Sequence, residues 1–325
     1  MCTTRTKLPT PHVLIVTHNS ADHIGPCVDS ICAAGAELIV IDNASTDETL
    51  AIVRSRCPGA TIVASPQNLG YGRAMNLGFR QARSEYVVLS NADVVFPQHS
   101  ISRLGAFLTD NPGIGVVGPQ QVFPDGSWQR SYGDLPGIWS GIKDAVGITS
   151  VHNQLRRACW PRQVDRRPKQ VPYLDGAVLV VRREAFLQVN GFDEDFFFYA
   201  EEADLCQRVR KAGWNVVFLP EVRVMHVRGG STTAKSESQF VRQQVNSQCL
   251  LASKHLPEWK VRLYASLQVI HFQRLQWSYR MLQVLRMHSH RLDKTDFFGQ
   301  MSQTWSQSLR QHFAGAVGSS DETVA

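Results

Sequence analysis

The sequence predicts an α/β domain with a mostly parallel sheet flanked by helices, followed by a helical C-terminal appendage. Short apolar runs alternate with helix-like segments between His12 and Gly118, the pattern of successive βαβ units. Residues from about 236 to 313 have a helical pattern and contain no catalytic motif. A chain of 325 residues with 43% hydrophobic residues can bury a core large enough for an enzyme-sized domain and an appendage.

The first part of the sheet follows from apolar runs separated by helix start and stop signals. Gly35 and the Cys57-Pro58-Gly59 turn end two of the helices. Right-handed crossovers then place the strands side by side in parallel. We expect strands at residues 12–17, 37–41, 61–64, 86–89 and 113–118, and helices at residues 20–34, 47–56, 73–82 and 97–109.

The middle of the chain, residues 119–172, is the least regular part. We expect a strand-turn-strand with a loop, the turn lying at residues 123–127. A basic cluster follows, which is either a solvated loop or a mobile segment that faces a diphosphate-bearing or membrane-bound acceptor. Its members are Arg156, Arg157, Arg162, Arg166, Arg167 and Lys169.

Order returns after this segment. Tyr173–Val181 reads as one apolar strand interrupted by Asp175-Gly176-Ala177, and residues 182–189 read as a short helix. Two further strands are expected at residues 215–219 and 222–226, joined through Pro220.

Composition narrows the class of protein. No run of 18 apolar residues occurs, so we expect no membrane-spanning helix, and the N-terminus reads as a strand rather than a signal peptide. Seven scattered cysteines without zinc spacing suggest reduced thiols in a cytosolic protein. The net charge of +6 indicates an anionic partner. We do not expect this partner to be a nucleic acid. Neither a phosphate-binding P-loop nor the G-x-G-x-x-G fingerprint is present.

The stretch Glu85–Phe96 is the first candidate for chemistry. Its apolar half turns abruptly into Ser90-Asn91-Ala92-Asp93, where the strand is expected to end. Open α/β sheets bind ligands at the carboxyl ends of their strands, and a hard divalent cation fits one or two carboxylates together with substrate phosphates. The alternative is that Asn91 and Asp93 only form the turn after the strand.

The second candidate is the acidic stretch Phe196–Cys206. Glu201, Glu202 and Asp204 crowd one expected helix start, where the helix dipole favours carboxylates in their ionised form. An ionised carboxylate at a pocket edge is what a general base requires. The alternative is an acidic first turn that only caps the helix.

Seven motifs in fixed order resemble the family 2 glycosyltransferases with the GT-A fold, and more narrowly their bacterial rhamnosyltransferase-like branch, over about residues 12–232. In chain order they are Val13–Asn19, Asp42–Asp47, Gln67–Gly78, Asn91–Asp93, Gly191–Asp193, Tyr199–Leu205 and His226.

The resemblance implies a role for each matching residue. Thr17, Asn19 and Asp42 would bind the base and ribose of the donor, with Asp47 nearby. Asn68, Gly70 and Arg73 would lie along the donor pocket. Asp175 and Gly176 would form the wall of the pocket at the acceptor entrance. Asp93 matches the last residue of the family's D-x-D metal motif, Asn91 stands where many members carry Asp, and His226 completes the metal or diphosphate site. Glu202 matches the acid that takes the proton from the acceptor hydroxyl, between Glu201 and Asp204. For Asp42 and Asp47, a helix cap is the alternative.

The resemblance also implies the reaction. We expect an inverting reaction that depends on Mg²⁺ or Mn²⁺ and transfers one sugar from a nucleoside-diphosphate donor to a lipid-linked or saccharide acceptor. The expected sugar is L-rhamnose, donated by dTDP-rhamnose, and the expected process is bacterial surface polysaccharide synthesis. Another hexosyl donor (UDP- or GDP-sugar) and a catalytically decayed membrane-associated scaffold are the alternatives. We expect residues 1–232 to form the catalytic domain, with a nucleotide-sugar half at 12–118 and an acceptor half at 119–232.

The C-terminal part is expected to be helical at residues 233–313, with a disordered tail at 314–325. Between Glu258 and Asp293 it carries six basic residues interleaved with apolar ones, which suits a surface rich in anionic lipid. This predicts a peripheral protein at the inner face of the cytoplasmic membrane. The alternative is that the apolar stripe packs on the catalytic domain and the arginines are its solvated face.

Overall fold

A computed structural model describes residues 10–160, 167–227, 237–284 and 294–314. The chain divides into two compact units. The first comprises residues 1–134 and 156–233, and the second comprises residues 135–155 and 234–325.

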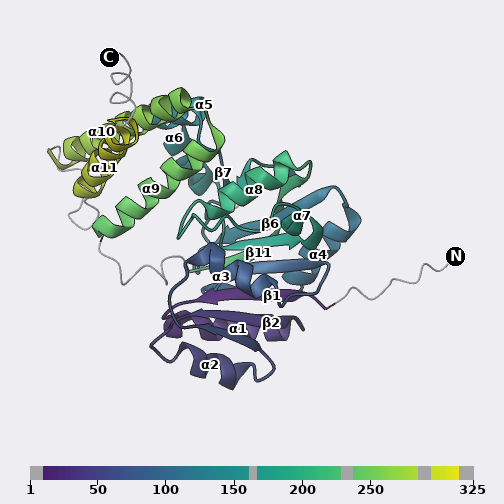
Figure 1. Cartoon of the computed structure of the whole chain (residues 1–325). Helices are drawn as coiled ribbons and strands as arrows, with labels where there is room; N and C mark the ends of the chain where they lie inside the picture. Colours follow the sequence, from purple (N-terminus) through teal and green to yellow (C-terminus); the bar gives the residue numbers. More distant parts are fainter. Residues whose placement is uncertain (1–9, 161–166, 228–236, 285–293, 315–325) are drawn as a thin grey trace, which may run out of the picture. The chain divides into compact units, whose positions relative to one another are not determined.

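The first unit is built on a mixed sheet, most of whose strands are parallel (Figure 1). β10 is antiparallel to both of its neighbours, β4 and β6, and so lies between two groups of parallel strands. The order across the sheet is β3 (Thr61–Ser65), β2 (Glu37–Asn43), β1 (His12–Thr17), β4 (Tyr86–Asn91), β10 (Val178–Arg182), β6 (Ile114–Val122), β11 (Asn215–His226) and β5 (Val94–Val95), with β8 (Lys169–Gln170) also paired to β11. The predicted α/β class with a mostly parallel sheet is confirmed.

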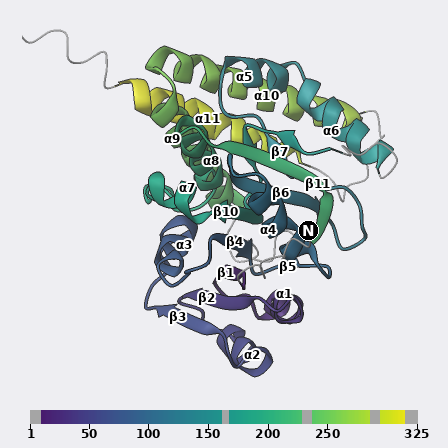
Figure 2. The ribbon, with the colours of Figure 1, turned by 90° about the vertical axis from the view of Figure 1, so that its right-hand side faces the viewer.

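Helices cover both faces of this sheet, as Figure 2 shows from the side. Within β1, Val13 and Ile15 belong to the core on one face and Leu14 to the core on the other, so the strand is buried on both sides. The first face is covered by α1 (Ala21–Ala33), α2 (Thr49–Arg56) and α4 (Ser100–Asp110), and the second by α3 (Tyr71–Phe79), α7 (Arg183–Gln188) and α8 (Glu201–Lys211).

Two strand predictions are wrong in detail. Tyr173–Val181 is not one strand, because the backbone N–H of Asp175 donates to the carbonyl of Ser131 at 2.9 Å and the chain changes sheet there. β9 (Tyr173–Leu174) pairs with β7 (Tyr132–Gly133) in a small separate sheet. Conversely, residues 215–226 form the single strand β11, which has an irregular register beside Pro220, a residue without an N–H to donate.

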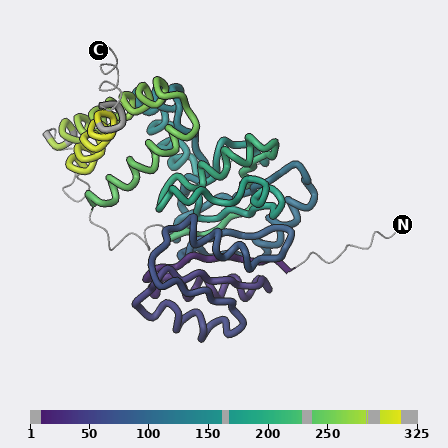
Figure 3. The backbone as a smooth tube through the Cα atoms, viewed as in Figure 1, coloured from purple at the N-terminus to yellow at the C-terminus, as the bar shows by residue number. Residues whose placement is uncertain are grey.

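The second unit is helical, which confirms the predicted C-terminal helices, and Figure 3 traces its backbone. It contains α5 (Ile138–Ala145), most of α6 (Ile148–Cys159), α9 (Glu237–His255), α10 (Glu258–Val284) and α11 (Thr295–Ala314). Its core is formed by side chains of α9, α10 and α11 such as Val245, Tyr264 and Trp305. No helix in the described part of the chain is long and apolar enough to cross a membrane.

The irregular structure expected across residues 119–172 is wrong for α5 and α6. α5 is stabilised by a long-range contact, since Gly141 lies against Leu267 and Tyr264 of α10 so closely that a Cβ would be 3.0 Å from Leu267 Cδ1. The structure groups residues 135–155 with the C-terminal helices. Residues 315–325 of the expected disordered tail, and Arg162 and Arg166 of the basic cluster, lie outside the described residues.

Candidate active site

Two buried polar atoms mark the carboxyl ends of β1 and β2. Thr17 and Asp42 are partners in the parallel ladder, and both side chains are buried. One oxygen of Asp42 accepts the backbone N–H of Ser45 at 3.1 Å, so the turn expected from the sequence is present. Thr17 Oγ1 and the other oxygen of Asp42 have no hydrogen-bond partner among the described residues. Because unsatisfied buried oxygens are costly, this edge is suited to a polar ligand.

Asn19 and Asp47 hold together the loops around this edge. Asn19 adopts a left-handed backbone (φ 49°), and its side-chain oxygen accepts the N–H of Thr46 at 2.8 Å. The Asp47 carboxylate accepts the N–H groups of Ala21 and Thr49, each at 3.0 Å. Burial raises the pKa of Asp47, but a hydrogen bond from the Thr49 hydroxyl, together with these N–H groups, outweighs it and lowers the pKa below its usual value. Asp47 thus ties the start of α1 to the start of α2, and its contact with a nucleotide stays a prediction.

The segment around the start of α3 contacts the loop before α8 through Asn68, Gly70 and Arg73. Gly70 has φ 82°, and a Cβ there would lie 2.3 Å from the carbonyl oxygen of Phe197, so no side chain fits. Asn68 Oδ1 accepts the N–H of Gly70 at 2.9 Å. Arg73 Nε donates to the carbonyl of Glu194 at 3.0 Å. These contacts shape the loop, and contact of the three residues with a donor stays a prediction.

Asp93 and His226 meet although they are far apart in sequence. His226 pairs with Val94 where β11 meets β5, and its Nε2 lies 3.4 Å from Asp93 Oδ1. Both side chains are buried. Burial raises the pKa of Asp93, but the adjacent His226 ring outweighs it and lowers the pKa below its usual value. Asp93 is therefore held as a carboxylate. Asn91 is partly buried, and its backbone N–H donates to Ala177 at 3.0 Å.

A network of buried amides surrounds the other side of the His226 ring. His226 Nδ1 lies 3.1 Å from Gln121 Oε1 and 2.7 Å from Gln129 Oε1. Gln120 Nε2 in turn donates to the carbonyl of Gln129 at 2.7 Å and to Ser131 Oγ at 2.9 Å. Reasoning from the sequence missed all four residues. The available signal was the Gln-Gln pair that interrupts the apolar run of β6, because buried polar side chains need hydrogen-bond partners.

Glu202 lies at the start of α8 against the Asp175-Gly176 turn. A Cβ on Gly176 would lie 3.2 Å from Glu202 Cβ, so a larger residue would crowd the carboxyl group. Burial, with the nearby charge of Asp175, raises the pKa of Glu202 to about 7, although Arg130 opposes this. Glu201 is fully enclosed and its pKa is raised well above the usual value by burial and by Glu202. The helix dipole was expected to favour the ionised form, but at Glu201 and Glu202 desolvation outweighs the dipole and raises both pKa values.

The backbone before α8 and the third acid of this stretch have structural consequences. Tyr199 and Ala200 have φ 72° and 68°, a left-handed conformation that is uncommon for residues with a side chain and clusters at functional sites. Asp204 accepts a hydrogen bond from Arg208 Nε at 2.7 Å. Arg208 also donates to the carbonyl of Gly191 at 2.7 Å, so Asp204 anchors α8 to that loop, and its catalytic role stays a prediction.

A continuous chain of contacts joins the Asp93–His226 pair to Glu202. Gln121, which contacts His226, donates through Nε2 to the carbonyl of Asp175 at 3.3 Å, and Asp175 precedes the Gly176 that abuts Glu202. The Tyr71 hydroxyl donates to the carbonyl of Gly176 at 3.4 Å. Burial raises the pKa of Tyr71 well above its usual value, and Glu201, Glu202 and Asp93 all add to the shift. The buried Tyr71 hydroxyl thus interacts electrostatically both with Asp93 and with the acids at the start of α8.

The protein groups at Asp93 suit a metal that is completed by its substrate. Among the described residues, no group of three or more His, Cys, Asp or Glu side chains could hold a metal alone. Asp93 and His226 offer one oxygen and one nitrogen ligand, and Asp93 Oδ1 makes no hydrogen bond within the described part. Divalent cations in phosphate chemistry commonly bind one or two carboxylates together with substrate phosphates and waters. The two residues fit that arrangement.

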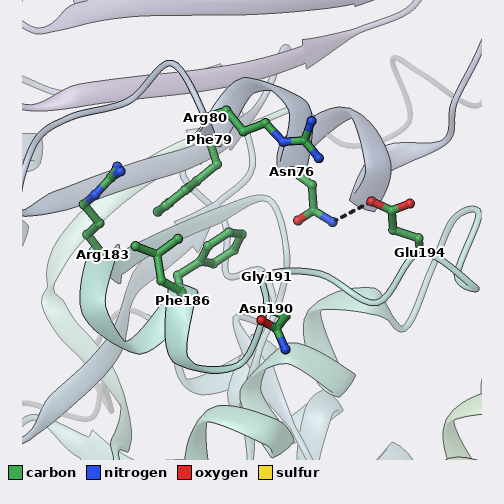
Figure 4. Close-up of a pocket in the computed structure, with 9 residues that line it drawn as sticks. Asn76, Phe79, Arg80, Arg183, Phe186, Asn190, Gly191 and Glu194 are labelled. Carbon is green, nitrogen blue, oxygen red and sulfur yellow. Dashed lines mark hydrogen bonds between the residues drawn. The ribbon is translucent and has the colours of Figure 1, made fainter.

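A pocket elsewhere in the first unit contains none of the predicted site residues. Figure 4 shows Phe79 and Phe186 at its wall and the hydrogen bond from Asn76 to Glu194. Arg183, also in its wall, follows β10, whose last residue pairs with Tyr86 at the start of β4. The pocket therefore lies toward the opposite end of the strands from Asn91.

The family model described as glycosyl transferase family 2 matches residues 12–189, and the one described as N-terminal domain of galactosyltransferase matches residues 166–229. N-acetylglucosaminyl-diphospho-decaprenol L-rhamnosyltransferase of Mycobacterium tuberculosis is 31% identical over 266 residues, which cover 77% of this chain and 87% of that protein. Rhamnosyltransferase WbbL of Escherichia coli K12 is 36% identical over 225 residues, 66% of this chain and 82% of that protein.

Solved structures agree on the fold. Mannosyltransferase PcManGT from Pyrobaculum calidifontis, in complex with GDP-Man and Mn²⁺, has a TM-score of 0.61 at 18% identity, with 94% of this chain and 88% of that one covered. GalNAc-T7 with UDP, GalNAc and Mn²⁺ has a TM-score of 0.58 at 15% identity, with 97% of this chain and 58% of that one covered. The chain therefore belongs to glycosyl transferase family 2 and is a glycosyltransferase with the GT-A fold.

Proposed function

We propose that the protein is an inverting, metal-dependent rhamnosyltransferase that moves L-rhamnose from dTDP-rhamnose to a lipid-linked saccharide in bacterial surface polysaccharide synthesis. The observation that carries the proposal is Glu202, with a pKa of about 7, connected through Gly176, Asp175 and Gln121 to the Asp93–His226 pair. The donor and acceptor classes are supported by the names of the relatives, two of which are rhamnosyltransferases and one of which is named for a diphospho-decaprenol acceptor.

The donor would bind across the carboxyl ends of β1, β2 and β4. Thr17 Oγ1 and the unpartnered oxygen of Asp42 would gain hydrogen bonds from the nucleoside. Asp93 and His226 would hold Mg²⁺ or Mn²⁺ beside the diphosphate, and the bound ion would supply positive charge against the developing negative charge of the leaving group.

The acceptor hydroxyl would be activated by Glu202. Its carboxylate accepts the proton while the hydroxyl oxygen attacks the anomeric carbon of the sugar, and the bond from that carbon to the diphosphate oxygen breaks. A single displacement of this kind inverts the anomeric configuration. A base with a pKa of about 7 suits proton transfer near neutral pH, because it is partly deprotonated and still basic enough to accept the proton.

We place this reaction at the inner face of the bacterial cytoplasmic membrane, with the protein bound peripherally. A lipid-linked acceptor is confined to a bilayer, while nucleotide sugars are dissolved in the cytoplasm. The enzyme must reach both, so contact with the membrane surface belongs to the proposal.

Transfer from dTDP-rhamnose to N-acetylglucosaminyl-diphospho-polyprenol tests this function directly. Wild type with Mg²⁺ or Mn²⁺ should form the rhamnosylated lipid, and Glu202→Gln should lose at least about 100-fold in rate, the usual contribution of a general base. Glu184→Gln, which changes an exposed acid at the start of α7, should keep full activity. Equal rates in wild type and Glu202→Gln would remove the proposed base.

The same assay separates the alternatives. Transfer from UDP- or GDP-sugars, with none from dTDP-rhamnose, would replace the donor but keep the reaction class. Absence of both transfer and donor hydrolysis for every donor would favour the decayed scaffold.

A further inference from the structure

α10 is apolar on two opposite faces. One face packs in the core of the second unit through Val261, Tyr264 and Ala265. The other face is exposed, and its five large apolar side chains fall within a sector of about 40° at 3.6 residues per turn. We call these five residues the outer stripe: Trp259, Leu263, Ile270, Trp277 and Met281, which are 59%, 40%, 51%, 63% and 40% exposed.

The neighbouring helices of the unit pack beside and behind the outer stripe. On one side, the carbonyl of Asp144 in α5 accepts hydrogen bonds from His271 Nδ1 at 2.6 Å and Arg274 Nη2 at 3.3 Å. On the packed side, the ring of Tyr264 lies 5.7 Å from that of Trp305 in α11. α10 and α11 run side by side, as Figures 1 and 3 show.

The outer stripe is too long to be incidental. Single exposed apolar residues are normal on protein surfaces, but contiguous ones mark interaction sites. From Trp259 to Met281 the stripe extends about 33 Å along the helix at 1.5 Å per residue. Such a length fits an extended partner surface rather than one small molecule.

The charges and residue types around the outer stripe select a lipid surface as its partner. α10 carries four basic residues, Lys260, Arg262, Arg274 and Arg280, and one acidic residue, Glu258. A tryptophan lies at or near each end of the stripe, and tryptophan prefers the boundary between hydrocarbon and headgroups. Helices that lie in this boundary combine an apolar face with basic residues that attract anionic lipid.

We propose that the outer stripe of α10 docks the protein on an anionic bilayer, with the helix axis parallel to the membrane plane. This deepens the proposed function, because a lipid-linked acceptor would then be presented at the surface on which the enzyme rests. Docking itself does not depend on the identity of the sugar or of the acceptor.

Vesicle sedimentation of the full chain tests the docking surface. Wild type should bind vesicles of phosphatidylcholine mixed with phosphatidylglycerol, and at least about tenfold more weakly those of phosphatidylcholine alone, since each basic residue near the surface contributes about 1 kcal/mol. Ile270→Glu/Trp277→Glu should reduce binding to the anionic vesicles by at least about tenfold. The matched control Leu187→Glu/Gln188→Glu adds two charges at exposed positions of the first unit and should bind as wild type does.

Two further readouts keep the result interpretable. Circular dichroism and the thermal midpoint should match wild type in both double variants, because all substituted side chains are exposed. Transfer to an acceptor with a short, water-soluble lipid should be unchanged in Ile270→Glu/Trp277→Glu, which separates failed docking from a wrong function. Undiminished vesicle binding by that variant would overturn the proposal. The proposal would also be overturned if wild type were a dimer, the variant were a monomer, and neither bound vesicles. A second copy of the chain would then be what covers the outer stripe.

A second inference rests on the amides around His226. The orientation of both glutamine side chains is fixed by their other hydrogen bonds. Gln121 Nε2 donates to the carbonyl of Asp175 and Gln129 Nε2 to the carbonyl of His226, each at 3.3 Å. Both Oε1 atoms therefore face His226 Nδ1. A ring nitrogen between two acceptors must carry the hydrogen.

We infer that Gln121 and Gln129 are positioning residues that keep the hydrogen of the neutral ring on Nδ1. Nε2, which faces Asp93 Oδ1 at 3.4 Å, then carries a second hydrogen only while the ring is charged, and its lone pair is the one that would bind the metal. Hydrogen bonds that fix the tautomer of a histidine ligand typically strengthen metal binding by 10- to 100-fold, so the buried amides would contribute about that much here.

Substitution of one glutamine at a time tests this inference. Gln129→Met keeps much of the side-chain volume but removes the acceptor, and should weaken Mn²⁺ binding about 10- to 100-fold in calorimetry with dTDP present. Gln129→Glu keeps an acceptor oxygen and should retain most of the affinity. Gln120→Met is the matched control, because Gln120 is equally buried and bonds backbone carbonyls and Ser131.

Nitrogen-15 NMR of the histidine rings gives a readout independent of activity. His226, assigned by its loss in His226→Gln, should show a protonated Nδ1 in wild type. A protonated Nε2 with bare Nδ1 in wild type, or an equal loss of Mn²⁺ affinity in Gln120→Met, would overturn the inference.

Discussion

Asp93 and Glu202 are acids of the same kind in opposite electrostatic surroundings. Desolvation by the surrounding protein raises the pKa of both carboxyl groups. Asp93 has the His226 ring beside it, and its pKa falls below the usual value. At Glu202 burial raises the pKa, the charge of Asp175 adds to the rise, and the pKa reaches about 7. Burial raises the pKa in both cases, and the neighbour decides whether that rise is reversed, as at Asp93, or increased, as at Glu202.

The difference suits the two acids to different roles. A carboxyl group that stays ionised across the physiological range is suited to bind a cation, and one that titrates near neutrality is suited to exchange a proton. Environments that push the pKa values of nearby acids apart are typical of active sites. Each of the following predictions tests this division of roles.

The largest effect is expected for Asp93→Asn. The amide keeps the shape but loses the charge, so Mn²⁺ binding measured by calorimetry and sugar transfer should each fall by at least about 100-fold, as when a key electrostatic group is removed from an active site. Asp125→Asn, at an exposed turn, is the control and should behave as wild type. Normal Mn²⁺ affinity in Asp93→Asn would contradict the role given to Asp93.

The pH dependence of transfer should follow Glu202. Because the carboxylate is the active form of a base, kcat/KM should rise about tenfold per pH unit below the pKa of about 7 and level off above it. Rates measured in buffers of constant ionic strength give the profile. A plateau that extends down to about pH 5 would show that a group with an ordinary carboxyl pKa is the base.

The stability of the fold should respond to the same group. The pKa of Glu202 is about 7 when folded and 4.5 when fully solvated, so the folded state binds more protons in this window. Stability from this group is therefore present below the solvated pKa and is lost as pH rises toward about 7. Glu202→Gln should raise the thermal midpoint relative to wild type at about pH 8 and leave it nearly unchanged at about pH 4. Calorimetric scans that show the same difference at both values would contradict the raised pKa.

The smallest effect is expected for Thr17→Val. The change removes a buried hydroxyl without a hydrogen-bond partner among the described residues, so stability should stay the same or rise by up to about 1 kcal/mol. If the hydroxyl binds the donor, the KM for the nucleotide sugar should rise about tenfold, the value of one hydrogen bond. Loss of stability with an unchanged KM would indicate a purely structural threonine.

Local signals predicted the first half of the sheet well. β1, β3 and β4 lie within two residues of their predicted bounds, because each is an apolar run bounded by polar or turn residues. Longer-range features were not predictable in this way. α5 owes its position to contacts with α10 more than one hundred residues later in the chain, and β10 enters the sheet antiparallel between β4 and β6.

The sequence by itself determined the family, the fold class and which acids are candidates for chemistry. These follow from residue types at fixed places along the chain, since a strand end and a helix start are local features. Only the tertiary structure decided the surroundings of those acids and the direction of each pKa shift, because a pKa depends on neighbours from distant segments. It placed His226 against Asp93, Asp175 beside Glu202 and the amides of Gln121 and Gln129 against His226.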